Sequence, residues 1–344
     1  MNRSKIEWCD YTFNLITGCF HGCDYCYARQ MTRRFSGEAR RNISRKGEYK
    51  TVTLPGGKTG YILEKPMAND DGVDIPYPFD FEPTLHLHRR ERLDNLKGTH
   101  KVFVGSMADV FGEWVPEEWI MEVFSVCEEH PLNNYLFLTK NPTRYLELSE
   151  KGLLPQGENY WYGSTITDEE TEFFVSSKHN TFISIEPILK PFKTIPQLGE
   201  FDGIRSIDWV IVGAETGNRK GKVIPELSWI QNIAQRADIA GVPVFMKDSL
   251  IPIVGEKNMR REYPEKLLAR KMSPKMEKKL FNICNRCKKK NRINRMVRLQ
   301  AQTLRGSTSR TYGYMCWECF EKHCESLGVD IPNIPNPLTG KETE

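Results

Sequence analysis

The chain has 344 residues, 39% hydrophobic and 27% charged, a balance typical of a soluble globular protein with one large domain and a small module. No apolar run approaches the ~20 residues that span a bilayer, and no apolar signal peptide begins the chain, so we expect a cytoplasmic protein without a membrane partner. The net charge of +4 hides an asymmetry, because residues 271–310 contain 13 Lys or Arg and a single acid. This basic end predicts an anionic partner.

Near the N-terminus, the segment ITGCFHGCDYCYARQ spaces Cys19, Cys23 and Cys26 as C-x3-C-x2-C. A strand-like YTFNLI precedes this loop and a helix-like YARQMTRRF follows it. Because the cytosol keeps thiols reduced, metal binding explains the ten cysteines better than disulfides do. Three thiolates on one loop suit a [4Fe–4S] cluster whose fourth iron stays open to an external ligand. A zinc site completed by Cys9 or His21, or a structural role, are the alternatives.

This loop resembles the signature of the radical SAM superfamily, which has the same spacing and an aromatic residue before the last cysteine. Tyr25 fills the aromatic position, where the resemblance implies contact with the adenine of S-adenosylmethionine (SAM). The resemblance further implies that SAM binds the open iron and is cleaved to a 5′-deoxyadenosyl radical. An electron donor such as flavodoxin or ferredoxin is then an expected partner.

After an insertion at residues 37–100, short apolar strands alternate with helices such as PEEWIMEVFSVCEEH and PELSWIQNIAQRADIAG. The predicted strands are 101–105, 134–139, 160–163, 181–185, 209–212 and 242–246. This alternation predicts an α/β fold with a parallel sheet closed or partly closed into a barrel, whose chemistry lies at the carboxyl ends of the strands. Polar residues recur at those ends: Asp109, Lys140, Thr165, Glu186, Glu215 and Lys247.

Several segments also resemble one uncharacterised branch of the radical SAM enzymes that is common in phages and mobile elements. They are Lys5–Asp10, Phe103–Phe111, Leu138–Pro142, Ser184–Pro187 and Val212–Gly217. The resemblance covers roughly residues 3–250 and implies a partial TIM-type, (β/α)6-like barrel, but it brings no established substrate.

The Gly-Gly-Glu stretch that holds the amino group of SAM in better-known members is absent from this chain. Ser106 and Asp109 occupy the equivalent place, so we expect them to bind the SAM ammonium. Glu215 is expected to meet the ribose hydroxyls, Gly213 to let the backbone approach the ligand, and Thr165 to add a further cofactor contact. The strand-end groups expected to face the substrate as catalytic residues are Lys140, Glu186 and Lys247.

The insertion contains a predicted hairpin with a Gly-rich turn, TLPGGKTGYILEK, and an Asp/Pro-rich loop. It is interpreted as a lid, a substrate platform or padding. His86 and His88 point to one face if their segment is a strand, and a half-buried structural pair is favoured over a metal site there.

The barrel is assigned to residues 1–255, and residues 256–344 are predicted to form a small basic module. Cys284-x2-Cys287 and Cys316-x2-Cys319 are paired knuckles that fit a tetrahedral Zn²⁺ site. An auxiliary iron–sulfur cluster is the main alternative. The dense Lys and Arg between the knuckles favour a nucleic-acid partner, and a solvated ribbon or one that docks on the barrel is the alternative.

The sequence therefore favours a radical SAM enzyme that modifies a nucleic acid or nucleotide by hydrogen abstraction. A peptide- or protein-modifying radical SAM enzyme with auxiliary clusters is the second hypothesis, and a non-enzymatic zinc-dependent DNA-binding protein is the third. Metal content separates them, since one cluster with one zinc, two clusters, or zinc alone is expected in turn.

Overall fold

The computed structural model describes most of the first 268 residues and four short stretches beyond them. The described residues are 3–96, 98–192, 207–217, 219–268, 281–283, 290–292, 296–302 and 309–327. Contacts divide the chain into two units, residues 1–270 and 271–344. Arg261, which follows the boundary predicted at residue 255, bridges to Phe245 in the main sheet. None of the described helices combines the length and apolar character needed to cross a membrane.

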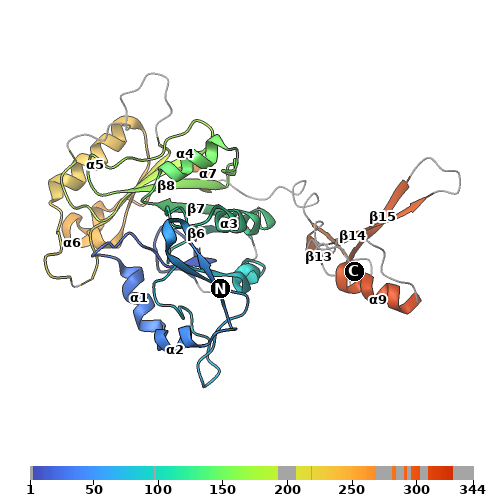
Figure 1. Cartoon of the computed structure of the whole chain (residues 1–344). Helices are drawn as coiled ribbons and strands as arrows, with labels where there is room; N and C mark the ends of the chain where they lie inside the picture. The colour runs from blue at the N-terminus through green and yellow to red at the C-terminus, as the bar shows by residue number, and fades with distance from the viewer. Residues whose placement is uncertain are drawn as a thin grey trace. The chain divides into compact units, whose positions relative to one another are not determined.

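The first unit is built on a seven-stranded sheet that curls into a half-barrel (Figure 1). In spatial order its strands are β1 (Tyr11–Phe13), β6 (Lys101–Val104), β7 (Asn134–Thr139), β8 (Tyr160–Ile166), β9 (Asn180–Ile185), β10 (Trp209–Val212) and β11 (Val244–Met246). Every neighbouring pair is parallel, and β1 and β11 form the two edges. The predicted α/β architecture with a partly closed parallel sheet is confirmed.

Two strand predictions differ most from the structure, while β11 starts two residues later than predicted. β8 continues to Ile166 beyond the predicted end at Gly163, because Ser164 and Thr165 pair with β9. The apolar run YTFNLI, predicted as one strand, is divided between β1 and β2 (Ile16–Thr17). These two strands join different sheets, so the chain bends between them.

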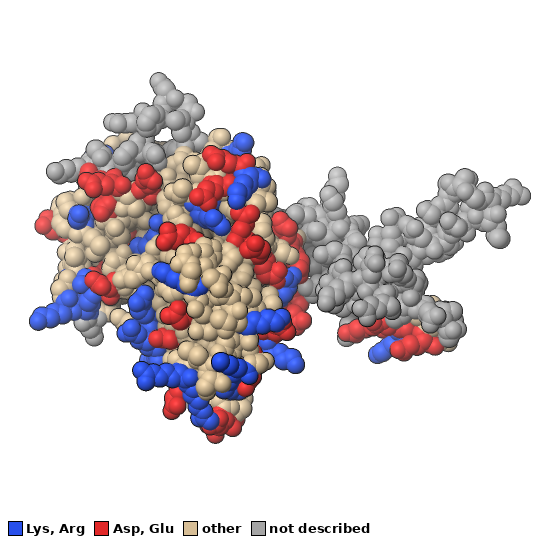
Figure 2. Space-filling view, viewed as in Figure 1, with Lys and Arg blue, Asp and Glu red and all other residues tan. Residues whose placement is uncertain are grey.

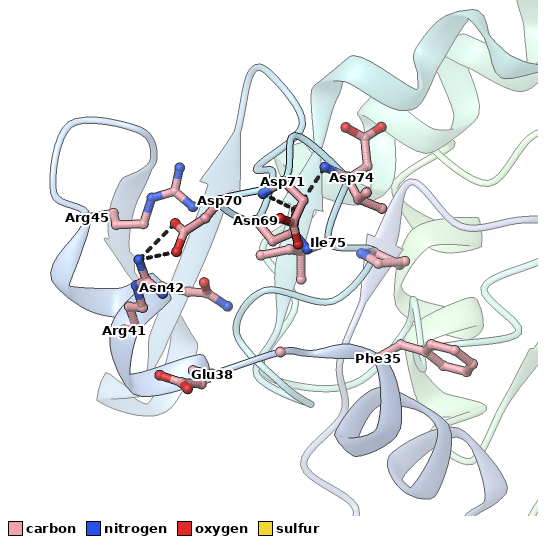
Figure 3. A pocket seen from close by; sticks show the side chains of 13 residues that line it. Phe35, Glu38, Arg41, Asn42, Arg45, Asn69, Asp70, Asp71, Asp74 and Ile75 are labelled. Atoms are coloured by element: carbon pink, nitrogen blue, oxygen red, sulfur yellow. Dashed lines mark hydrogen bonds and ion pairs between the residues drawn. The ribbon is translucent and has the colours of Figure 1, made fainter.

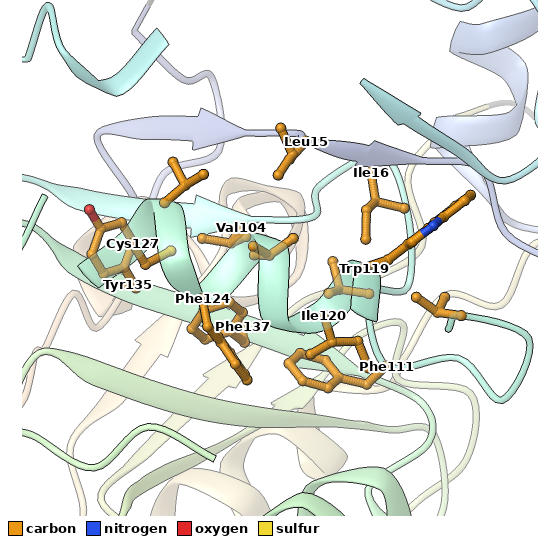
Figure 4. Packing of buried hydrophobic residues seen from close by; sticks show 14 of the residues in the cluster. Leu15, Ile16, Val104, Phe111, Trp119, Ile120, Phe124, Cys127, Tyr135 and Phe137 are labelled. Atoms are coloured by element: carbon orange, nitrogen blue, oxygen red, sulfur yellow. The ribbon is translucent and has the colours of Figure 1, made fainter. Parts of the chain in front are cut away.

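Helix α3 (Glu117–Glu129) covers the sheet near its first edge and shows why both faces of the strands are apolar. Its buried residues Ile120, Phe124 and Cys127 pack in one cluster with Tyr135 and Phe137 of β7 (Figure 4). Burial of a side chain such as Phe124 stabilises the fold by about 2–3 kcal/mol. Parallel strands that are covered on both faces read as continuous apolar runs, as β7 does.

Among the other helices of the first unit, α4 (Thr143–Glu150) lies between β7 and β8, α5 (Leu227–Ala240) lies between β10 and β11, and four short helices follow β11 (Figure 1). These four are η3 (Asp248–Leu250), α6 (Ile251–Val254), η4 (Glu256–Asn258) and α7 (Glu265–Leu268). Gly241 ends α5 with φ of 66°, a left-handed conformation that favours glycine.

Three strands of the insertion join β2 in a second, four-stranded sheet, in the order β2, β5 (Thr84–His86), β4 (Thr59–Leu63) and β3 (Lys50–Thr53). The predicted hairpin is confirmed, since β3 and β4 are antiparallel and are joined by the short helix η1 (Pro55–Gly57). Helices α1 (Tyr27–Phe35), α2 (Ala39–Ser44) and η2 (Leu87–Leu93) complete this part. Because β2 directly precedes the cysteine loop, the insertion holds one end of that loop.

The parts of the second unit that the structure describes form two hairpins and a helix. The hairpins are β12 (Phe281–Ile283) with β13 (Lys290–Arg292), and β14 (Met296–Gln302) with β15 (Ser309–Cys316), followed by α9 (Trp317–Leu327). Cys316 ends β15 and Cys319 lies in the first turn of α9. Cys284 and Cys287 lie outside the described residues, so the zinc site stays a prediction.

Candidate active site

Backbone contacts fix the start of the cysteine loop. Gly18 donates its N–H to the carbonyl oxygen of Met107 at 2.9 Å, and Cys19 donates to that of Phe81 at 3.1 Å. Gly18 has a φ of 91°, and a Cβ there would lie 2.4 Å from the backbone of Glu82. Only glycine fits this close approach, which brings Cys19 to the end of the main sheet.

The end of the loop is held by the helix that follows it. Cys26 is the N-cap of α1, and its Sγ accepts the backbone N–H of Arg29 at 3.5 Å. Burial, together with negative charge on Asp109, Cys26 and Cys23, raises the pKa of the Cys19 thiol to about 12. Because the negative charges of these thiolates disfavour one another, a bound cation would stabilise them.

The donors that the loop offers are the three thiols of Cys19, Cys23 and Cys26. Thiolates are the ligands that iron–sulfur clusters take, so the chemistry of these residues fits such a cluster, and a zinc ion stays the alternative. In the described stretches, no group of three His, Cys, Asp or Glu side chains is placed to hold a single metal ion.

Asp109 links the cysteine loop to two strands of the sheet. His21, between the first two cysteines, lies with Nε2 2.7 Å from Asp109 Oδ2. The same carboxylate accepts the Thr139 hydroxyl at 2.7 Å and the backbone N–H groups of Lys140 and Phe111 at 2.9 and 3.1 Å. Asp109 is only 5% exposed, so both oxygens are occupied by protein donors. Its predicted contact with the SAM ammonium stays a prediction.

Asn14 is a site residue that sequence reasoning did not select. Its Nδ2 donates to the Ser106 hydroxyl at 3.0 Å, and its Oδ1 accepts the backbone N–H of Met107 at the same distance. The Tyr27 hydroxyl donates to the carbonyl oxygen of Ser106 at 2.7 Å. Asn14 thus holds the turn after β6 against the cysteine loop. The signal that could have identified Asn14 is its place four residues after the family-like segment Lys5–Asp10.

Tyr25 and Lys140, predicted for different roles, meet in the structure. Lys140 Nζ donates to the Tyr25 hydroxyl at 2.9 Å and lies 5.2 Å from the centre of its ring. Burial raises the pKa of Tyr25, although the positive charge of Lys140 opposes the shift. The phenol therefore stays neutral and oriented at the end of β7.

A second set of polar side chains lies where β9, β10 and β11 end. Lys247 Nζ donates to Glu186 Oε1 at 2.5 Å, with Glu7 Oε2 4.0 Å away. Burial by itself would lower the pKa of Lys247, but the charge and the hydrogen bond of Glu186, together with the charge of Glu7, outweigh burial and raise the pKa. A Cβ on Gly213 would lie 3.2 Å from carbons of both partners, so glycine leaves room for the pair. Burial of its hydroxyl raises the pKa of Tyr27, and the charge of Glu186 raises it further, although the side chain as a whole is 48% exposed.

Glu215 is buried and Thr165 is partly buried. Glu215 has a side chain only 1% exposed, and its two oxygens accept from Arg219 Nε and Nη2 at 2.6 and 2.8 Å. This bidentate pair lowers the pKa of Glu215. Thr165 is a partly buried residue within β8, opposite Ser184 of β9. Their predicted contacts with SAM stay predictions.

His86 and His88 are not on one strand. His86 ends β5 and His88 lies in η2, and their rings contact edge to face with centres 5.5 Å apart. His86 Nε2 lies 2.8 Å from the Thr17 hydroxyl, and Nδ1 of each ring is buried without a hydrogen-bond partner. Burial lowers the pKa of His86 and lowers that of His88 to about 4.

We expect the free energy of unfolding to fall as the pH is lowered from about 6.5 to about 4. In this range the unfolded His88 takes up a proton, whereas the folded side chain, with its pKa of about 4, does not. The unfolded state then binds more protons, so stability decreases by up to about 1.4 kcal/mol per pH unit for each such histidine. Urea titrations at several pH values measure the slope, which His88→Gln should reduce.

A cavity of about 410 Å³ lies within the insertion, and none of the predicted site residues lines it. Figure 3 shows Arg41 of α2 reaching across to Asp70, whose carboxylate it meets at 2.6 and 2.7 Å. Phe35 of α1 also lines this cavity. It is therefore separate from the polar groups at the strand ends.

Sequence comparison adds a family to this fold and site. The family model described as "Protein of unknown function (DUF5131)" matches residues 3–279. The chain therefore belongs to this family. No curated protein matches the sequence.

Three solved structures of spore photoproduct lyase resemble the chain remotely. The lyase complexed with dinucleoside spore photoproduct is 9% identical with a TM-score of 0.32, over 92% of this chain and 72% of that one. Two substituted forms of the lyase are each 10% identical, with TM-scores of 0.31 and 0.32, over 92% and 95% of this chain and 72% and 75% of theirs. Similarity at this level carries no argument about function, which rests on the residues of the site.

Proposed function

We propose that the chain is a radical SAM enzyme in which Cys19, Cys23 and Cys26 hold a [4Fe–4S] cluster. The observation that carries the proposal is the place of the cysteine loop, which follows β2 and is anchored to the carboxyl end of β6 in a parallel half-barrel. When bound, the cluster supplies the electron that cleaves SAM to a 5′-deoxyadenosyl radical. The residues around it orient the loop, SAM and the substrate.

The polar groups at the strand ends divide these tasks. His21 and Asp109 hold the loop, and Lys140 fixes the Tyr25 ring, whose neighbouring backbone is proposed to lie against the adenine. The SAM contacts of the proposal are Ser106, Asp109, Thr165, Gly213 and Glu215. The groups proposed to meet the substrate are Lys140, Glu186 and Lys247, since a charged pair that is only partly exposed can orient a polar ligand.

The proposed substrate is a nucleic acid or nucleotide. Support comes from residues 271–310, whose 13 Lys or Arg against one acid favour a phosphate backbone through counterion release. The paired cysteine knuckles of the same unit are proposed to bind Zn²⁺ and to hold this basic segment. A cytoplasmic setting, which keeps thiols reduced, is part of the proposal.

The decisive experiment is anaerobic reconstitution with iron and sulfide, followed by metal analysis and assay of 5′-deoxyadenosine. We expect about four irons and one zinc per chain, and SAM cleavage that single-stranded DNA or RNA accelerates. Four irons without SAM cleavage would contradict the radical assignment. Eight irons without zinc, and no response to nucleic acid, would favour action on a peptide or protein instead.

Gly213→Ala is expected to push Glu186 and Lys247 apart and so to impair catalysis more than folding. The new Cβ would lie 3.2 Å from side-chain carbons of both residues, closer than ordinary contact. Because their chains must move, we expect a loss of at most about 1–3 kcal/mol in stability but at least a tenfold loss of substrate-dependent SAM cleavage. Urea unfolding and product analysis measure the two effects. A destabilised variant with full turnover would show that the pair has no part in the reaction.

A further inference from the structure

Helix α1 leaves an apolar face exposed beside the cysteine loop. Tyr27, Met31 and Phe35 are 48%, 41% and 47% exposed. They are spaced four residues apart, so they lie on one side of the helix, while Ala28 and Thr32 are buried on another. Large apolar side chains gathered on a surface mark a site of interaction, whereas single ones do not.

Unpaired cations border this face. Residues 27–46 contain seven Lys or Arg and one acid, and Figure 2 shows Lys and Arg side chains over α1 and α2, at the lower left of the view. Arg41 and Arg45 are neutralised by Asp70 and Glu48. A second set is exposed and makes no ion pair with any residue that the structure describes: Arg33, Arg34 and Arg40.

The face begins at the proposed cluster. Cys26 caps α1, and the next residue, Tyr27, is the first of the exposed apolar residues. The Tyr27 hydroxyl also bonds to Ser106, so this end of the helix is fixed to the site. A partner that covers α1 would therefore lie close to the cysteine thiols. Closeness matters because electron transfer between proteins weakens steeply with distance.

We propose that the exposed surface of α1 docks a small acidic electron-transfer protein, with Tyr27, Met31 and Phe35 as its apolar face and Arg33 and Arg34 as exposed cations of the same helix. The inference rests on the proposed function. One electron would pass from the reduced partner to the oxidised cluster, with no bond or proton exchanged, so the partner is oxidised by one electron and the cluster reduced by one. Such encounters use small interfaces, and charge complementarity sets their rate.

The composition of this surface favours a protein partner over a nucleic acid. Tyr, Phe, Met and Arg are the residue types enriched in protein interfaces, and the exposed surface of α1 contains all four with no Lys between Tyr27 and Phe35. Single-stranded nucleic acid instead follows a basic groove. The exposed side of an isolated helix is convex, which suits a small patch on another protein.

The test uses two double variants. The first carries Arg33→Glu and Arg34→Glu on α1, and the charge-matched control carries Lys178→Glu and Lys257→Glu. Both control lysines are exposed and lie outside α1. The first readout is the binding of oxidised flavodoxin, an acidic probe, to the reconstituted full chain by calorimetry at low salt. We expect at least tenfold weaker binding for the α1 variant, unchanged binding for the control, and weaker binding of both wild type and control as salt rises.

The second readout separates this inference from the proposed function. SAM cleavage driven by sodium dithionite should be equal in wild type and both variants, whereas cleavage driven by reduced flavodoxin should fall only in the α1 variant. Wild-type protein that cleaves no SAM with dithionite would refute the proposed function, while the calorimetry still tests the docking face. Equal flavodoxin binding in all proteins would overturn the inference. The inference would also be overturned if the α1 variant lost oligonucleotide binding or self-association while it bound flavodoxin as tightly as the wild type.

Discussion

Replacing Cys26 with serine is expected to abolish iron binding while leaving the fold intact or slightly more stable. Cys26 is the N-cap of α1, and its sulfur accepts a backbone N–H. Serine is a preferred N-cap residue, so the helix keeps its cap. A hydroxyl is a poor ligand for iron, and the cluster loses one of its three ligands. Iron content should fall from about four to below about one per chain.

SAM cleavage by Cys26→Ser should fall by more than about a hundredfold, because even neighbours of metal ligands cost 10–100-fold when they are changed. Iron analysis, visible absorbance and 5′-deoxyadenosine measure the loss, and thermal unfolding checks the fold. The control is Cys127→Ala, which removes a buried thiol from α3. It should retain the iron and lose about 1–2 kcal/mol of stability. Equal iron in both variants would exclude Cys26 as a ligand.

Asp109→Ala is expected to cost about 3–5 kcal/mol of stability and to release the cysteine loop. The change leaves the buried donors of Thr139, Lys140 and Phe111 without their acceptor. It also removes the 2.7 Å contact with His21, which ties the loop to β6. Urea unfolding measures the stability, and iron analysis after reconstitution measures whether the cysteine loop still binds iron.

His21→Ala separates the two effects of Asp109. The His21 side chain is 23% exposed, and its removal leaves the other donors to Asp109 in place. We expect a loss of only about 1 kcal/mol in stability, together with a clearly slower rebuilding of the cluster. If His21→Ala takes up iron as fast as the wild type, the loop does not depend on this contact and Asp109 acts only in the sheet.

The strands could be predicted from the sequence because each one is a continuous apolar run. β7 and β9 are buried along nearly their whole length, so the pattern marks them without any knowledge of their neighbours. The run YTFNLI was predicted wrongly as one strand. Tyr11–Phe13 pairs with β6, and Ile16–Thr17 pairs with β5 in the insertion, and no local signal announces this change of partner.

The polar site residues were predictable as a group but not in their pairings. Each predicted strand end carries a polar side chain, and the sequence places them all at one edge. The sequence does not show which of these side chains bond to each other. In the structure Lys140 donates to Tyr25 and Lys247 donates to Glu186. Arg219 donates to Glu215. The first two pairings join residues 115 and 61 positions apart, so they depend on the order and register of the strands.

The sequence by itself determined the cysteine spacing, the alternation of strands and helices, and the basic C-terminal segment, because these are properties of neighbours along the chain. Only the tertiary structure decided how the loop is held. Asn14 with Ser106, and His21 with Asp109, join residues 92 and 88 positions apart. The tertiary structure also left the apolar side of α1 uncovered. The physical reason is that buried polar groups must find partners, and the partner is set by which strand ends lie together.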